Sequence, residues 1–202
     1  MRRVVLLFLA VLLLVPACSS NNHETENPMV TLELDNGSEI VIELYPDVAP
    51  NTAANFVYLV QQGFYDGLTF HRIVPQFVIQ GGCPLGSGRG NPGWFIRGEF
   101  SDNGFDNTLQ HQRGVVSMAR RGDHYDSAGS QFFIMVDDSS QLDGGYAAFG
   151  RVLEGMLEVD RIVEAPAVNQ QPLEPQRIVR ATVKLGEWTP EAPEKLTEED
   201  LM

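Results

Sequence analysis

A short stretch of the chain places a cation and amides among apolar residues, in a pattern that a simple hydrophobic core does not explain. Arg72 and Gln80 lie within the apolar segment 70–82, and Gln131 opens a second apolar run at 131–136. Polar groups half-buried on strands are unfavourable unless they are paired, so several of them together indicate a site. Guanidinium and amide groups recognise a substrate by hydrogen bonding, and the guanidinium keeps its charge at any working pH.

Other kinds of site are not supported by the sequence. Segment 86–90 is rich in glycine, but it lacks the Gly-Lys-Ser/Thr ending of a phosphate-binding loop, and no βαβ pattern surrounds it. No Gly-x-Ser-x-Gly elbow occurs, and the four histidines do not have the spacing of metal ligands. We therefore expect no hydrolase, no metal site and no cofactor.

Short strands and two helices are predicted to position these polar residues. Segments 30–34 and 40–44 alternate apolar and polar residues around an Asn-Gly pair, which predicts a β-hairpin. Apolar residues at helical spacing predict a helix at 50–62, and a second helix is expected at 155–164. Many short strands with two helices predict a mainly β chain that closes into a barrel. The remaining strands are expected at 68–74, 77–80, 114–119, 131–136, 147–152 and 177–185.

Three blocks of the sequence resemble the signature blocks of the cyclophilins, a family of peptidyl-prolyl cis-trans isomerases. They are Phe-His-Arg-Ile-Val-Pro-Gln-Phe-Val-Ile-Gln-Gly-Gly at 70–82, Gly-Ser-Gln-Phe-Phe-Ile at 129–134, and Leu-Asp-Gly at 142–144 followed by Phe149-Gly150. The resemblance extends over residues 29–185. It implies a closed antiparallel β-barrel of about eight strands capped by two α-helices, and a cofactor-free isomerase of X-Pro bonds.

The resemblance also implies a role for individual residues. By matching position, the catalytic set is Arg72, Phe77 and Gln80, in which Arg72 hydrogen-bonds the prolyl nitrogen and Gln80 orients Arg72. The remaining matched positions would bind the substrate. Val78, Met118, Phe133 and Leu142 would surround the proline ring together with Phe77. Gln131 and the backbone of Ala119 and Arg120 would hold the peptide, Gly88 would line a neighbouring pocket, and Tyr146 would be a further substrate contact.

Three positions depart from the family pattern. Gln141 stands where many members carry Trp, Tyr146 where others have His, and Arg120 where others have Asn. Tyr146 keeps an apolar ring and a hydrogen-bonding group. Arg120 is expected to bind peptide through its backbone, so that its side chain alters peptide preference rather than turnover.

The N-terminus resembles a bacterial lipoprotein signal. Arg2 and Arg3 precede the apolar run 4–15, which is shorter than the about 20 residues of a spanning helix. The run ends in Val-Pro-Ala-Cys at 15–18, where the cysteine of such a signal is lipidated. We predict a signal peptide at 1–17, a lipid on Cys18 and a polar tether at 18–28; the alternative is ordinary secretion with cleavage near Ala17.

Composition and charge limit the partners. The 202 residues carry a formal net charge of −13, which makes nucleic acid an unsuitable partner. If Cys18 is lipidated, Cys83 is the one thiol left and cannot form an intramolecular disulfide. The isomerase-like domain is expected at 29–186, and the acidic segment 187–202 is expected to be a mobile tail.

The main hypothesis is a monomeric isomerase, lipid-anchored in the cell envelope outside the cytoplasmic membrane, that acts on proline-containing segments of unfolded or exported polypeptides. The alternative is a lipid-tethered chaperone or assembly module that binds such segments without significant catalysis. The complete set Arg72, Phe77 and Gln80 favours catalysis, because a pure binder would not need Arg72. A lipoprotein that carries small ligands would need an enclosed apolar cavity instead.

Overall fold

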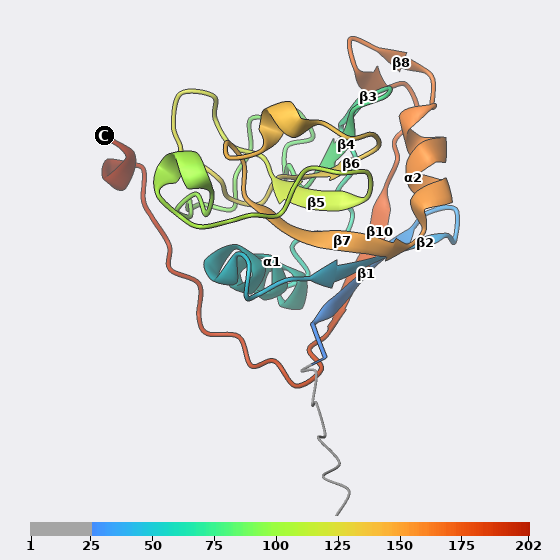
Figure 1. Cartoon of the computed structure of the whole chain (residues 1–202). Coiled ribbons are helices and arrows are strands. Elements are labelled where there is room, and N and C mark those ends of the chain that lie inside the picture. Colours follow the sequence, from blue (N-terminus) through green and yellow to red (C-terminus); the bar gives the residue numbers. More distant parts are fainter. Residues whose placement is uncertain (1–25) are drawn as a thin grey trace, which may run out of the picture.

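A computed structural model describes residues 26–202 of the chain. The predicted signal peptide, Cys18 and most of the predicted tether lie outside the described residues. Within residues 26–202, no helix has the length and apolar character needed to cross a membrane. The chain folds into one curled antiparallel sheet with a helix on each of two opposite sides (Figure 1).

The sheet contains eight strands in the order β10-β1-β2-β7-β5-β6-β4-β3. Their bounds are β1 Met29–Leu34, β2 Glu39–Leu44, β3 Arg72–Val74, β4 Val78–Gly81, β5 Val115–Met118, β6 Phe132–Met135, β7 Ala148–Glu154 and β10 Ile178–Lys184. A separate hairpin pairs β8, Ala167–Val168, with β9, Gln171–Pro172. The helices are α1 Pro50–Gln61 and α2 Met156–Val163, with short 3-10 turns η1 Ser101–Asn103, η2 Ser140–Leu142 and η3 Glu199–Leu201.

The mainly β architecture is confirmed, but the predicted closure of the barrel is incomplete. No ladder joins the two edge strands β3 and β10 within the described chain. The edges meet just before these strands, where Thr69 and Arg177 form an isolated bridge and the N–H of Ile178 donates to the carbonyl of Leu68 at 2.8 Å. The sheet therefore curls into a barrel whose seam is irregular.

Local sequence explains the hairpin and both helices. Gly37 adopts a φ of 81° in the predicted turn between β1 and β2. Pro50 occupies the first turn of α1, where its missing N–H is not needed. The carboxylate of Glu99 accepts hydrogen bonds from the first free N–H groups of that helix, at 2.8 and 3.0 Å. Gly155 precedes α2 with a φ of 95°, and a Cβ there would lie 2.3 Å from the carbonyl oxygen of Glu39.

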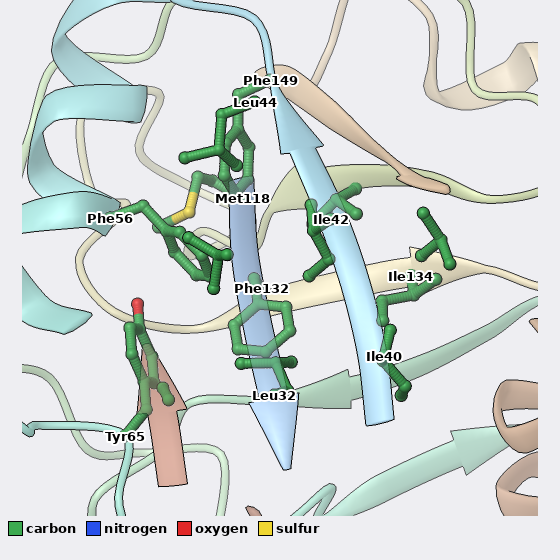
Figure 2. Packing of buried hydrophobic residues seen from close by; sticks show 14 of the residues in the cluster. Leu32, Ile40, Ile42, Leu44, Phe56, Tyr65, Met118, Phe132, Ile134 and Phe149 are labelled. Atoms are coloured by element: carbon green, nitrogen blue, oxygen red, sulfur yellow. The ribbon is translucent and has the colours of Figure 1, made fainter. Parts of the chain in front are cut away.

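The barrel interior is filled by aromatic and aliphatic side chains from α1 and from strands on all sides (Figure 2). Phe56 of α1 is fully buried, and its ring centroid lies 5.0 to 5.3 Å from those of Tyr65, Phe132 and Phe149. Aliphatic side chains of β1 and β2 point inward toward these rings, as their alternation in the sequence predicts. This packed interior gives the strands that carry the site a rigid support.

Residues 187–202, which the sequence predicts to be a mobile tail and which we call the C-terminal strap, make specific contacts with the domain. The strap runs from the end of β10 past α1 and along the body (Figure 1). Leu196 exchanges two backbone hydrogen bonds with Phe95, at 2.8 and 2.7 Å. Leu201 near the end of the chain is 8% exposed. An acidic, proline-containing composition predicts solvation, but these specific contacts hold the segment against the domain.

A buried histidine connects β5 to the turn after η2. The Nδ1 atom of His111 lies 2.9 Å from the carboxylate of Asp143, and its Nε2 atom lies 3.0 Å from the hydroxyl of Ser117. The ring stacks on Phe133, with 6.0 Å between the centroids. Burial lowers the pKa of His111 below its usual value of 6.5, although the hydrogen bond and the charge of Asp143 oppose this shift.

We predict that His111 makes the folded state less stable in acid. Because the native pKa is below that of the unfolded chain, the unfolded state binds the proton first as pH falls below about 6.5, and stability is lost there. The urea midpoint should therefore fall between pH 7.5 and pH 5.5, and less steeply in His111→Gln. Between pH 7.5 and 8.5 the two proteins should show the same pH dependence, and equal slopes below pH 6.5 would contradict the prediction.

Candidate active site

The register of three neighbouring strands aligns the residues that the sequence singles out. Arg72 on β3 is paired with Gln80 on β4, and Gln80 is paired with Phe133 on β6. Cross-strand partners on one face lie about 5 Å apart, which is close enough for their side chains to interact. A cation, an amide and an aromatic ring therefore stand in one row across the sheet, on the face turned away from the barrel core.

A chain of hydrogen bonds fixes the cation in this row. Nη1 of Arg72 donates to Oε1 of Gln80 at 3.2 Å, and Nε2 of Gln80 donates to Oε1 of Gln131 at 3.0 Å. Gln131 in turn donates to the carbonyls of Gly88 and Gly90, each at 2.9 Å. The three predicted polar residues thus satisfy one another. We call them the Arg72–Gln80–Gln131 relay.

A fourth residue, which sequence reasoning missed, holds the other side of the guanidinium. Nε of Arg72 donates to Oε1 of Gln170 at 2.8 Å, and the backbone N–H of Ile73 donates to the carbonyl of Gln170 at 2.7 Å. Gln170 lies at the tip of the β8–β9 hairpin with a φ of 67°, next to Asn169 with a φ of 51°. Residues other than glycine rarely adopt this left-handed conformation, but the two-residue turn of a β-hairpin requires it at both positions.

A cavity of about 120 Å³ opens beside the relay, and we call it the apolar cavity because six of its nine lining residues are apolar or aromatic; the other three are Arg72, Gln80 and Arg120. The rings of Phe133 and Tyr146 meet edge to face on its wall, with 5.7 Å between centroids. The size and apolar lining suit a small ring with one side facing the guanidinium of Arg72. All nine of its lining residues are predicted site residues: Arg72, Phe77, Val78, Gln80, Ala119, Arg120, Phe133, Leu142 and Tyr146.

 For Arg120 the sequence predicts a contribution from the backbone, and here its guanidinium carbon also lies 4.8 Å from the ring centroid of Tyr146, which lines the same cavity.

A second, larger cavity of about 310 Å³ adjoins the apolar one. Gln80, Ala119 and Arg120 line both cavities, so a single extended ligand could occupy the two together. Gly88 and Gln131, which are predicted for a neighbouring pocket, both line this larger cavity. Its wall also includes Phe95 and Arg121, which sequence reasoning did not identify.

Met118 is the predicted site residue that the structure does not bring to the site. It is 1% exposed and belongs to the barrel core, where Figure 2 shows it beside Leu44 and Phe56. Side chains alternate between the two faces of a strand, and on β5 the inward positions are Val116 and Met118. The site face of β5 instead carries Val115 and the serine that bonds His111.

The side chain of Arg120 is enclosed by aromatic rings rather than extended into solvent. Its guanidinium carbon lies 4.8 to 5.4 Å from the ring centroids of Tyr146, Tyr125 and Phe100. Its Nε donates to the carbonyl of Gly145 at 2.9 Å. The side chain of Arg120 is therefore held in place beside the two cavities that it lines. Gln141 is exposed and lines neither cavity.

No group of three or more His, Cys, Asp or Glu side chains in residues 26–202 has the geometry to hold a metal ion. Cys83 is buried, and its sulfur accepts a hydrogen bond from the N–H of Gly90 at 3.3 Å. What the site offers is a hydrogen-bonded cation facing an apolar cavity. Such an arrangement suits a small apolar ring that carries a hydrogen-bond acceptor, and it contains no nucleophile.

Known proteins share both the sequence and the fold of this chain. Residues 29–183 match the family model described as cyclophilin type peptidyl-prolyl cis-trans isomerase/CLD. The chain is 48% identical over 123 residues to peptidyl-prolyl cis-trans isomerase B of Bacillus subtilis, which covers 61% of this chain and 82% of the relative. It is 43% identical over 145 residues to a peptidyl-prolyl cis-trans isomerase of Synechococcus elongatus, covering 68% and 94% of the two chains.

A solved structure agrees with these matches. A cyclophilin type isomerase of Cryptosporidium parvum, crystallised in the presence of the dipeptide Ala-Pro, aligns with a TM-score of 0.70 and 28% identity. The alignment covers 77% of this chain and 98% of that chain. The family model matches residues 29–183, which is most of the chain. The chain therefore belongs to the cyclophilin-type peptidyl-prolyl cis-trans isomerases.

Proposed function

We propose that this isomerase rotates X-Pro bonds by donating a hydrogen bond from Arg72 to the prolyl nitrogen while the proline ring occupies the apolar cavity. Amide resonance sets a barrier of about 18–20 kcal/mol to this rotation, and uncatalysed exchange takes tens to hundreds of seconds. A donor that bonds the nitrogen as it becomes pyramidal weakens the resonance. The bond forms only in the twisted state, so it raises the rate rather than the affinity alone.

The geometry of the guanidinium is the observation that carries the proposal. Gln80 and Gln170 accept hydrogen bonds from Nη1 and Nε of Arg72, and no described residue accepts one from Nη2. The fixed fork of the guanidinium therefore leaves N–H donors for a substrate beside the apolar cavity. Both acceptors fix the orientation of the guanidinium before substrate binds. Little conformational entropy is therefore lost from Arg72 during the reaction.

The other residues of the site would hold one side of the X-Pro bond while the other side rotates. Phe77, Val78, Phe133 and Leu142 would enclose the proline ring, since they line the apolar cavity. The peptide chain would lie along the larger cavity, where Gln131 and the backbone near Ala119 are available. Positioning of this kind needs no nucleophile and no metal.

We further propose that the substrates are proline-containing segments of unfolded or exported polypeptides, outside the cytoplasmic membrane. The N-terminal residues 1–18 support this location, because a positive start and a short apolar run lead to Cys18 as in a lipoprotein signal. One acyl chain binds a membrane only marginally, so a stable anchor requires more than one chain. In this proposal the domain works as a monomer at the membrane surface.

Replacing Arg72 by alanine should lower kcat/KM on a short X-Pro peptide by roughly 10²–10³-fold, the usual effect of losing a donor that acts in the transition state. A protease-coupled assay on the mature protein measures this directly. Arg180→Ala is the matched control, because Arg180 is exposed on β10. An Arg72→Ala variant as fast as the wild type would exclude the role of Arg72, and a wild type without acceleration would favour a binding module.

Replacing Gln170 by alanine should lower kcat about tenfold with little change in KM, because a hydrogen bond to a charged group is lost and Arg72 becomes mobile. Gln170→Gly relieves the backbone strain but also lacks the side chain, so it should be as slow as Gln170→Ala. Gln170→Glu keeps an acceptor and should recover most of the activity. A glycine variant as active as the wild type would show that kcat depends on the backbone of the turn and not on the side chain of Gln170.

Mass spectrometry of the mature N-terminus tests the proposed anchor. The expected mass is that of a chain starting at Cys18 and carrying lipid, and a Cys18→Ser variant should be found in the soluble fraction. An unmodified Cys18 in the wild type would exclude lipid anchoring and leave ordinary secretion as the explanation of residues 1–17.

A further inference from the structure

The C-terminal strap lies beyond the residues that the family model matches, yet it reaches the wall of the larger cavity. The match ends at residue 183, whereas the strap comprises residues 187–202. Leu196 forms a two-way backbone bridge with Phe95, and Phe95 lines the larger cavity. A segment outside the common domain therefore pairs directly with a residue of the site.

Several independent contacts hold the strap in this position. The ammonium of Lys195 lies 3.7 Å from the ring centroid of Trp94 and 4.2 Å from that of Tyr58. Asn51 and Glu194 exchange hydrogen bonds, because the amide of Asn51 donates to the carbonyl of Glu194 at 3.1 Å and accepts from its N–H at 2.8 Å. Together with the buried Leu201, these contacts distribute the attachment along the strap.

An ion pair connects the strap to a cation of the cavity wall. Glu198 accepts two hydrogen bonds from Arg121, one on each carboxylate oxygen, at 2.8 and 3.1 Å. The guanidinium of Arg121 also lies 4.7 Å above the ring of Phe95. Such a two-point bond restrains the side chain, and the carboxylate partly offsets its charge although both groups are exposed to solvent. Glu198 thus holds Arg121 in place and places a negative charge beside it.

The charge of Arg121 matters because three arginines line the larger cavity. Arg120 is held among aromatic rings and backbone carbonyls, and Arg89 is exposed and makes no ion pair within the described chain. Asp123 lies close enough to act electrostatically on Arg121, but Glu198 is its direct partner. Without Glu198, the cavity would present one more free guanidinium to a ligand.

We propose that the strap sets the substrate preference of the larger cavity by holding Arg121 against Phe95 and partly offsetting its charge with Glu198. The proposal rests on the isomerase activity and adds to it a specificity element outside the common domain. A peptide whose proline fills the apolar cavity places a neighbouring side chain in the larger one. When Glu198 is paired with Arg121, an acidic side chain of the peptide in this cavity gains little binding energy from Arg121. When Glu198 is removed, the freed guanidinium binds the carboxylate of that side chain.

A peptide series tests this assignment. The peptides carry Glu, Gln or Lys at one of the two positions before proline, with Ala as the reference, and kcat/KM and affinity are measured for each. In Glu198→Gln, the ratio of kcat/KM for the Glu peptide to that for the Lys peptide should rise about threefold at one position, the size expected of one exposed ion pair. Glu199→Gln removes the same charge one residue away and should leave the ratio near that of the wild type.

Exchanging the two charges separates pairing from net charge. In Arg121→Glu alone the ratio should fall, because an acidic group replaces the cation of the wall. In the double variant Arg121→Glu with Glu198→Arg the pair is restored, and the ratio should return toward the wild type. Equal ratios in the wild type, Glu198→Gln and the double variant would overturn the proposal.

The experiment distinguishes failure of the strap proposal from failure of the proposed isomerase activity. Loss of turnover on the Ala peptide in the wild type would concern the activity itself, while the affinities of the same peptides would still test the strap. Deletion of residues 187–202 should reproduce the direction seen in Glu198→Gln. A deletion variant that stays folded and keeps the wild-type ratio would show that the strap does not act on the cavity.

Discussion

The site depends on holding one guanidinium in place beside an apolar cavity. A cation in such a place is unfavourable unless acceptors surround it, and here Gln80 and Gln170 supply them from two separate parts of the chain. The amide of Gln131 extends the relay to backbone carbonyls, so the last acceptors in the row are part of the main chain. The orientation of Arg72 is therefore determined by the fold rather than by its own flexible side chain.

The same strands serve the core with one face and the site with the other. On β5, Met118 packs inside the barrel while Ser117 bonds the histidine that stacks on Phe133. Phe132 and Phe133 divide in the same way on β6, since the first belongs to the core and the second to the apolar cavity. A tightly packed interior consequently limits movement of the cavity wall.

Local patterns in the sequence predict much of this arrangement, and long-range contacts account for the rest. The hairpin and both helices follow from alternation, turn residues and helical spacing, whereas the contact of Gln80 with Arg72 is implied by the family resemblance. The contact of Arg72 with Gln170 joins residues 98 positions apart, and that of Arg121 with Glu198 joins residues 77 positions apart. No local pattern contains such contacts, and the burial of Met118 in the core depends on which face of β5 turns inward.

The central claim is that Gln80 acts through Arg72, and a double-mutant cycle in kcat/KM tests it most directly. We expect Gln80→Ala to lower kcat/KM markedly in the wild-type background and to have little further effect once Arg72 is alanine. Residues in one hydrogen-bonded network show coupling energies of about 0.5–3 kcal/mol, and the cycle isolates that coupling. Effects that simply add, so that Gln80→Ala is equally harmful with and without Arg72, would contradict a relay that works by holding the guanidinium.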